Sequence, residues 1–226
     1  MAVASPVSDK LTTAALLLLT FATGLIDAVS VLVLGHVFVA NMTGNVIFLG
    51  FWFVPDSGVD LTAAVVAFGG FLVGTILSGR FARHLAARTR LWLTVTLGLE
   101  AAWLMVLAGL AGAGVLDYHD NGKLILIAGL AMAFGSQNAA ARQFGVQELS
   151  TTVLTSTIVG LGVDSRLAGG TGDREKLRYT VVFTMLGGAV VGATMTRFVV
   201  APVIALAAVV VFAALLIFRH GPAADS

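Results

Sequence analysis

A single aspartate stands inside the long apolar run near the start of the chain. Asp27 follows Thr20 and Thr23 and precedes Ser30, and this spacing places four polar side chains on one helical face. A charge at the centre of a membrane span costs about 2.5–3.5 kcal/mol, so such a residue indicates function by default. Asp27 could carry a proton or bind a cation. Alternatively, it could be protonated and hydrogen-bonded to a helix break, holding the fold.

The apolar run breaks at Gly35 and His36 and restarts as a short segment, 43–54. A second short apolar segment, 150–163, is rich in serine and threonine. Both segments are shorter than the roughly 20 residues that a spanning helix needs. Non-helical backbone at membrane depth must be buried in protein or line a water-filled cavity. We therefore expect two re-entrant half-helices whose N-terminal ends bring N–H groups to a shared site; the alternative is a pair of surface helices without a cavity.

The residues of this expected site come from both halves of the chain. Glu100 lies in the middle of another apolar run and could face Arg142, Asn138 or the cavity, in a structural or a transport role. The predicted substrate- or ion-binding residues are Asp27, Thr43, Asn45, Gln137, Asn138, Thr155 and Thr157, and the secondary candidates are Ser30, Glu100 and Arg142.

The second half of the chain repeats the first, element for element. Gly35 aligns with Gly145, and Asp27 aligns with Gln137, about 110 positions later. The glycine pattern of Gly70 and Gly74 recurs in the second half, about 118 positions later, at Gly188 and Gly192. Because Gln137 is neutral, a symmetric site with two carboxylates is not expected.

The amino-acid composition indicates whether the surface of the chain faces water or lipid. The 226 residues are 58% hydrophobic and only 11% charged, with a mean hydropathy of +0.98. Soluble domains carry about 25% charged residues, so most of this surface must face lipid. The net charge of +1 says nothing about nucleic acid, but the sequence has no basic stripe that would bind it, so nucleic acid is not expected as a partner. With no cysteine and no metal or phosphate motif, we expect neither a cofactor nor an enzyme.

Charge in the loops predicts the topology. Six spans put the basic loop 80–90 and the loop 143–178 inside, whereas eight would put loop 80–90 outside, against the positive-inside rule. We therefore predict an all-α, polytopic fold of the bacterial inner membrane with both termini cytoplasmic. It forms one domain, 1–226, built as an inverted repeat of three spans each, 12–112 and 124–218. The six predicted spans are 12–34, 60–80, 91–112, 124–142, 179–198 and 201–218.

The repeated glycines have a packing explanation. Small residues let helices approach closely, so Gly70, Gly74, Gly188 and Gly192 are expected to pack the spans 60–80 and 179–198, across the axis that relates the repeats. The same faces could instead pack between two chains, which would make a homo-oligomer.

The run from Asp27 to Asn45, D-A-x-S-x-L-x-L-G-x-x-F-x-x-N-M-T-G-N, resembles the signature of the bacterial YoaK-like family. The later runs Gly135 to Arg142 and Leu154 to Thr157 resemble a second signature of that family. The resemblance covers most of the chain and implies a six-span inner-membrane protein. It implies no substrate and no catalytic residues.

Two functions follow as hypotheses. The first is a small-solute or ion transporter, or a channel-like protein, with the lipid bilayer as its surroundings and Asp27 as its coupling group. The alternative is a membrane scaffold or regulatory subunit that transports nothing. An acid/base pair of Glu100 and Asp27 could in principle act in an intramembrane enzyme, but no nucleophile or metal set accompanies it.

Overall fold

The computed structural model describes residues 5–54, 58–85, 88–118, 122–144 and 154–222, and within them the chain is helical and contains no strand. Six of its helices are long and apolar enough to cross a membrane. They are α1 (Asp9–Leu32), α3 (Leu61–His84), α4 (Thr89–Gly112), α5 (Gly122–Arg142), α7 (Glu175–Thr196) and α8 (Ala201–His220). The all-α, polytopic membrane fold is thereby confirmed.

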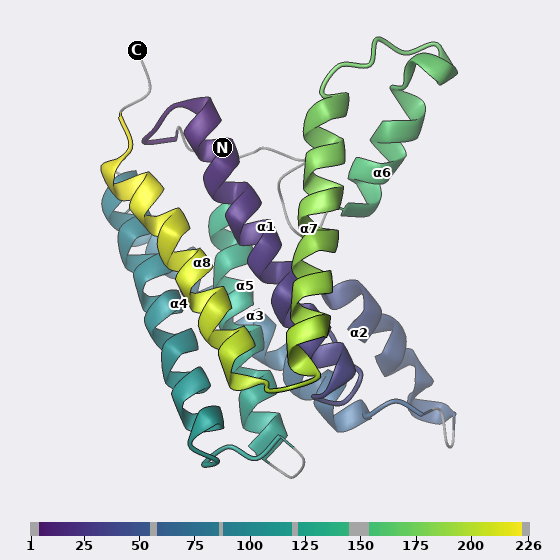
Figure 1. The fold of residues 1–226 in the computed structure, drawn as a ribbon, viewed down its shortest axis with the longest axis vertical. Helices are drawn as coiled ribbons and strands as arrows, with labels where there is room; N and C mark the ends of the chain where they lie inside the picture. The colour runs from purple at the N-terminus through teal and green to yellow at the C-terminus, as the bar shows by residue number, and fades with distance from the viewer. Residues whose placement is uncertain (1–4, 55–57, 86–87, 119–121, 145–153, 223–226) are drawn as a thin grey trace.

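Two further helices are too short to span. α2 (Met42–Leu49) continues into a 3₁₀ turn, η1 (Gly50–Phe53), and α6 (Leu154–Val163) leads to a second 3₁₀ turn, η4 (Arg166–Ala168). At 1.5 Å per residue each short helix is about 12–15 Å long, roughly half of the hydrocarbon core. Figure 1 shows both on the same side of the bundle, with α2 toward the lower end, where it packs against α3, and α6 toward the upper end, where it packs against α7.

Several charged residues predicted to lie in loops belong to helices instead. Arg80, Arg83 and His84 lie in the last turns of α3, so the predicted loop 80–90 is wrong in its first half. Lys176 and Arg178 lie in the first turn of α7 rather than in the predicted loop 164–178. Long basic side chains can extend to the membrane interface from a continuous helix, so their charge does not require the helix to end. Of the predicted loop 143–178, residues 143–144 are described, whereas residues 145–153 lie outside the described residues.

The long helices pair between the two predicted repeats. α1 and α5 are the first spans of these repeats, and each packs along the second span of the other repeat: α1 along α7, and α5 along α3. The third spans, α4 and α8, pack along each other. In Figure 1, α1, α4 and α7 run downward along the chain and α3, α5 and α8 run upward. An inverted repeat of three spans each would produce this pairing.

Close backbone approaches explain the repeated glycines. Gly70 and Gly74 face α5, where a Cβ added to Gly74 would overlap the backbone of Met132. Gly188 and Gly192 face α1 in the same manner. The four glycines therefore bring α3 against α5 and α7 against α1, and these interfaces lie within one chain. The expected close approach of the spans 60–80 and 179–198 to each other is wrong, because each of them packs instead on the first span of the other repeat.

Each of these interfaces also has a glycine on its other helix. Gly135 of α5 lies against the backbone of Phe71, and Gly24 of α1 lies against the backbone of Met185. A side chain at either position would force the helices apart. The two interfaces thus use small residues on both partners.

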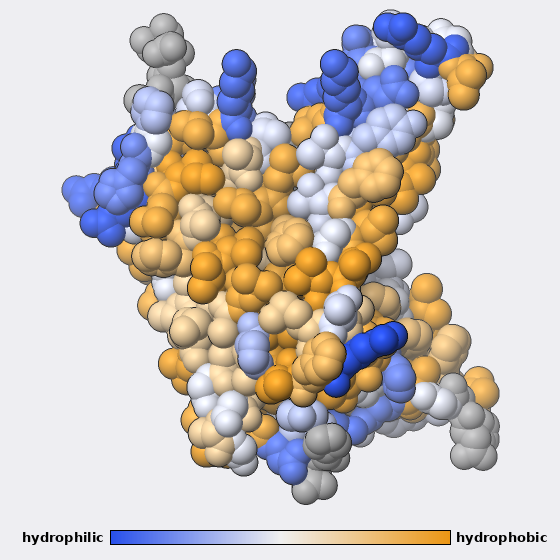
Figure 2. All heavy atoms as spheres, in the orientation of Figure 1, coloured by the Kyte–Doolittle hydropathy of each residue, from blue (hydrophilic) through white to orange (hydrophobic). Residues whose placement is uncertain are grey.

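The two ends of the bundle are polar and its middle is apolar, as Figure 2 shows. At one end, the guanidinium of Arg90 donates hydrogen bonds to the carbonyl oxygens of Pro6, Arg219 and Gly221. This places the first and the last described residues of the chain at the same end of the molecule, next to the start of α4 (Figure 1).

The other end carries an ion pair. Lys123 at the start of α5 lies 2.7 Å from the carboxylate of Asp60, which also accepts a 3.0 Å hydrogen bond from the Ala63 N–H and so caps α3. Partial burial raises the pKa of Asp60, but the hydrogen bonds from Lys123 and Ala63 outweigh it and hold the pKa below its ordinary value. Asp60 therefore fixes the start of α3 against the start of α5.

Candidate functional site

The carboxylate of Asp27 is the centre of the break between α1 and α2. It is buried, and one of its oxygens accepts hydrogen bonds from the backbone N–H groups of Val39 (3.1 Å) and Ala40 (2.9 Å). The side-chain amide of Asn41 donates to the other oxygen. The carboxylate thus satisfies two backbone N–H groups that are in no helix, as irregular backbone inside a membrane protein requires, and Asn41 adds a third donor.

Asn45 holds the same break from the other side. Its side-chain oxygen accepts a 2.9 Å hydrogen bond from the N–H of Phe38, and its amide donates to the carbonyl oxygen of Phe38. The side chain is fully buried. Asn45 therefore closes the loop onto α2 and does not face the cavity described below.

The second repeat contributes two amides to this centre. Asn138 of α5 donates to the carbonyl oxygen of Ala40 (3.4 Å) and to that of Phe134 (2.9 Å). Gln137 donates to the carbonyl oxygen of Leu19 (3.3 Å). Both are buried, so α5 is tied to α1 and to the break by amide groups rather than by charge.

A cavity of about 530 Å³ lies beside Asp27, where the two short helices approach each other. Thr43 and Gly44 at the start of α2 line it, and Leu154 and Thr155 at the start of α6 line it as well. The remaining wall is formed by α1, α7 and the break before α2, with the lining residues Gly24, Asp27, Ala28, Val31, Leu32, Phe38, Asn41, Met185, Ala189 and Ala193. We refer to it as the Asp27 cavity.

The start of α2 keeps its donors available to this cavity. Asn41 occupies the N-cap position of α2, but its side chain makes no capping hydrogen bond because it is directed to Asp27. The first-turn N–H groups of a helix without a side-chain cap can serve a ligand. The Asp27 cavity thus combines a carboxylate, an amide, two threonines and a helix N-terminus.

The predicted site residues fall into three groups. The structure brings Asp27, Thr43 and Thr155 together around the Asp27 cavity. A second group is buried in packing around it and supports the break or the helices: Asn45, Gln137, Asn138, Thr157 and Ser30. Glu100 and Arg142 form the third group and lie elsewhere.

Glu100 is not part of the Asp27 cavity. It lines a second cavity between α3, α4 and α5. Arg142 is exposed at the end of α5. The predicted proximity of Glu100 to the Asp27 site is therefore not found, because α4 packs against α5 and α8 rather than against the break.

Sequence reasoning missed two features of the Asp27 cavity. Asn41, which bonds the carboxylate, lies in the same polar run as Thr43, and that run was the available signal. The wall made by Met185, Ala189 and Ala193 carries no polar residue that could have marked it. Only the position of α7 against α1 brings that wall to the site.

The fold and the break define a class: multi-pass α-helical membrane proteins with two half-helices around a buried carboxylate. A family profile described as "Protein of unknown function (DUF1275)" matches residues 15–217. The chain belongs to this family.

The chain is also similar to the UPF0700 transmembrane protein YoaK of Bacillus subtilis (strain 168). The two are 35% identical over 148 residues, which is 64% of this chain and 63% of that protein. The match thus spans less than two thirds of the relative's length. It confirms the predicted YoaK-like family membership. No solved structure matches the chain.

Proposed function

We propose that this protein moves a small polar solute or an ion across the membrane through the Asp27 cavity. One observation carries the proposal. Two half-helices from opposite ends of the bundle place their first turns, with Thr43 and Thr155, around one cavity with a buried carboxylate. Discontinuous helices that meet at a site between inverted repeats are a recurrent design of secondary transporters.

The chemistry of the cavity supports a polar cargo. Hydroxyl, amide and carboxylate groups line this cavity, and polar groups inside a membrane cost free energy unless they are paired. Such a lining therefore suits a polar cargo better than a lipid chain. Asp27 would be the coupling group that holds a cation or a proton. The amides of Gln137 and Asn138 would hold the helices around it without adding charge.

We also propose an orientation. Both termini lie at the end of the bundle that carries Arg83, Arg90 and Arg219, and the positive-inside rule places such an end in the cytoplasm. The protein would then be a bacterial inner-membrane protein with cytoplasmic termini. We further propose that it acts without a cofactor, without nucleic acid and without catalysing a reaction.

A scaffold or regulatory function remains the second candidate, and one observation favours it. Both oxygens of Asp27 accept hydrogen bonds from the break. A carboxylate engaged in this way can stabilise the fold without binding any cargo.

Transport can be measured on proteoliposomes adsorbed to a sensor for solid-supported membrane electrophysiology. The panel would be sodium, potassium, ammonium, chloride, acetate and the common amino acids. We expect a protein-dependent current for at least one of them, and we expect Asp27→Asn to abolish it. Asp60→Asn is the matched control, since it neutralises a carboxylate outside the Asp27 cavity and should keep the current. Equal currents in wild type and Asp27→Asn would remove Asp27 from the mechanism, and no current at all would favour the scaffold.

A further inference from the structure

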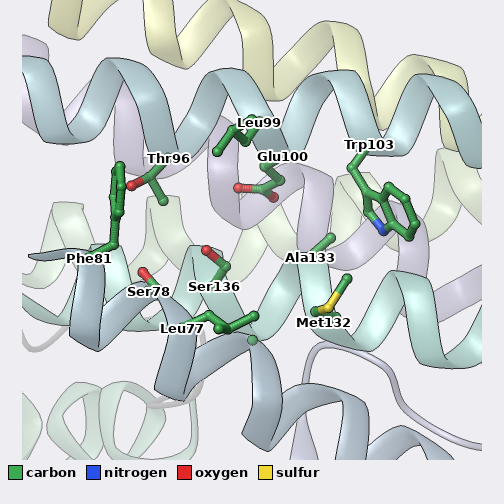
Figure 3. A pocket seen from close by; sticks show the side chains of 11 residues that line it. Leu77, Ser78, Phe81, Thr96, Leu99, Glu100, Trp103, Met132, Ala133 and Ser136 are labelled. Carbon is green, nitrogen blue, oxygen red and sulfur yellow. The ribbon is translucent and has the colours of Figure 1, made fainter.

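The cavity around Glu100 is separate from the proposed transport site. It measures about 330 Å³, lies between α3, α4 and α5, and shares no lining residue with the Asp27 cavity. Figure 3 shows the carboxylate of Glu100 pointing from α4 into the space that faces Ser136 and Ala133 of α5. We refer to it as the Glu100 cavity.

Four buried oxygen atoms at this place have no hydrogen-bond partner among the described residues. They are both carboxylate oxygens of Glu100, the hydroxyl of Thr96 and the hydroxyl of Ser78. Glu100 is 3% exposed, Thr96 5% and Ser78 4%. All three residues line the Glu100 cavity, and Ser136 adds a further hydroxyl. Buried polar groups are rarely left without partners, so such a cluster in one cavity indicates a ligand.

The rest of the cavity wall is apolar or aromatic. Leu77, Leu99 and Met132 form its hydrocarbon surface, with Phe81 and Trp103 as the two aromatic side chains. The indole N–H of Trp103 already donates to the carbonyl oxygen of Gly129 (3.1 Å), so the indole can offer the ligand only its ring. Aromatic rings of this kind attract cations as well as hydrocarbon.

These features select a ligand by charge and shape. A bare metal cation such as calcium prefers six to eight oxygen ligands, more than one carboxylate and three hydroxyls provide. A proton alone would neutralise Glu100 but would leave the hydroxyls of Thr96 and Ser78 without partners. A protonated amine offers a positive charge and several N–H donors, and its hydrocarbon part would match the apolar wall.

We propose that the Glu100 cavity binds a hydrophobic organic ammonium ion. The ammonium group lies at the carboxylate of Glu100 and donates to the hydroxyls around it. The hydrocarbon part lies among Leu77, Met132 and Trp103. This site is independent of the proposed transport function.

The packing of the helices gives this ligand a route. α3 and α4 touch each other at few positions, and the flanking side chains Leu77 and Leu99 are exposed. The opening between α3 and α4 faces the hydrocarbon of the bilayer, so an amphiphilic cation can enter laterally. The cavity also lies between α4 and α5, and the helices that correspond to this pair in the other half of the molecule are α8 and α1. These two pack more closely against each other than α4 and α5 do. The Glu100 cavity is thus an asymmetric feature of the two halves.

Trp103 provides a reporter for the test. In a Trp52→Phe, Trp92→Phe background in detergent or nanodiscs, Trp103 is the one tryptophan that remains. Phenethylammonium is the probe, and 2-phenylethanol is its neutral counterpart of similar shape. We expect a saturable change of Trp103 fluorescence with phenethylammonium and an affinity at least about ten-fold lower for 2-phenylethanol.

The variants separate charge recognition from simple partitioning. Glu100→Gln keeps the shape of the side chain and should weaken phenethylammonium binding at least about ten-fold, and Thr96→Val should weaken it less. Asp9→Asn is the control and should bind the probe like wild type, because it neutralises an exposed carboxylate that does not line the Glu100 cavity. Equal affinity for the charged and neutral probes, no saturable change, or an unaffected Glu100→Gln variant would overturn the proposal. If the double tryptophan replacement does not fold, the charged and the neutral probe can be compared instead by the rise in melting temperature that each gives to the protein with all three tryptophans.

Discussion

At the scale of the residue, the side chain of Asp27 contacts both the break before α2 and the Asp27 cavity. Its oxygens accept three hydrogen bonds from the break before α2, and its side chain also lines the cavity between the short helices. The first contact stabilises the fold and the second makes the carboxylate available to a cargo. The two readings of Asp27 that the sequence leaves open are therefore both compatible with its geometry.

Asn45 is expected to have a purely structural role. Replacing it in Asn45→Ala removes both hydrogen bonds to Phe38 and leaves partly buried backbone groups without these partners, at up to about 1–3 kcal/mol each. We expect a lower melting temperature in detergent, measured by intrinsic fluorescence. Thr43→Ala, at an exposed neighbouring position on α2, is the control and should melt like wild type. Equal melting temperatures of the two variants would contradict the assignment of Asn45 to the loop.

Asp60 should make the stability of the protein depend on pH. Because its pKa is lower in the folded protein than the ordinary value near 3.8, its ionised form stabilises the fold. This contribution is fully present above the ordinary value and is lost as the pH falls through the lowered one. We expect Asp60→Asn to have a lower melting temperature than wild type at pH 6, and we expect the two melting temperatures to converge near pH 3. A difference that is the same at both pH values would show that the Lys123 ion pair contributes nothing.

At the scale of the element, the helices pair through glycine faces. α3 meets α5 and α7 meets α1 with backbones so close that a single methyl group would collide with the facing chain. These contacts lie between the two predicted repeats and hold one against the other. The tight pairs also leave α3 loosely packed against α4, where the Glu100 cavity opens.

Two glycines of α3, Gly74 and Gly69, give a matched test of this pairing. In Gly74→Ala, the new methyl group overlaps the backbone of Met132 and should destabilise the protein by about 1–3 kcal/mol. At Gly69 no atom lies within 4 Å of an added Cβ, so Gly69→Ala should be neutral or stabilising by up to about 1 kcal/mol. Unfolding by sodium dodecyl sulfate, followed by circular dichroism, measures both. If the two variants unfold alike, the close approach of α3 and α5 is not real.

Much of this architecture could be predicted from the sequence, for definite reasons. Hydrophobic length gives the six spans, and the 43–54 and 150–163 segments are short because polar residues and glycine interrupt them. Helix ends were less predictable, since Arg83 and Lys176 continue helices into the polar region. The partners of buried groups were not predictable: Asn45 resembled a lining residue, and only the folded loop shows that it bonds Phe38. The separation of Glu100 from Asp27 likewise depends on packing between distant helices.

At the scale of the whole molecule, the bundle has one basic end with both termini and one end with the Asp60–Lys123 pair. The glycine faces are already used within the chain, so a homo-oligomer would need another surface. The two short helices lie on the same side of the bundle, α6 against α7 and α2 against α3 (Figure 1). Both line the Asp27 cavity, so the proposed transport function would use one site per chain.

The orientation can be tested with introduced cysteines, because the native chain has none. Val115→Cys lies in the connection between α4 and α5, and Thr171→Cys lies between α6 and α7, at the opposite end; both positions are exposed. In intact spheroplasts, a membrane-impermeant maleimide should label Val115→Cys, whereas Thr171→Cys should react only after lysis. The reverse pattern would place the termini outside and contradict the proposed topology.

The most direct test of the central claim is the water accessibility of the Asp27 cavity. Thr43→Cys and Thr155→Cys line this cavity, whereas Ile47→Cys and Val159→Cys lie on the same short helices, exposed but outside it. We would measure the rate of reaction of each with a methanethiosulfonate carrying a trimethylammonium group, in membrane vesicles. We predict fast reaction at Thr43→Cys and Thr155→Cys and slow reaction at the two control positions. Equal rates at all four positions, or no reaction at the two cavity positions, would contradict a water-filled site between the half-helices.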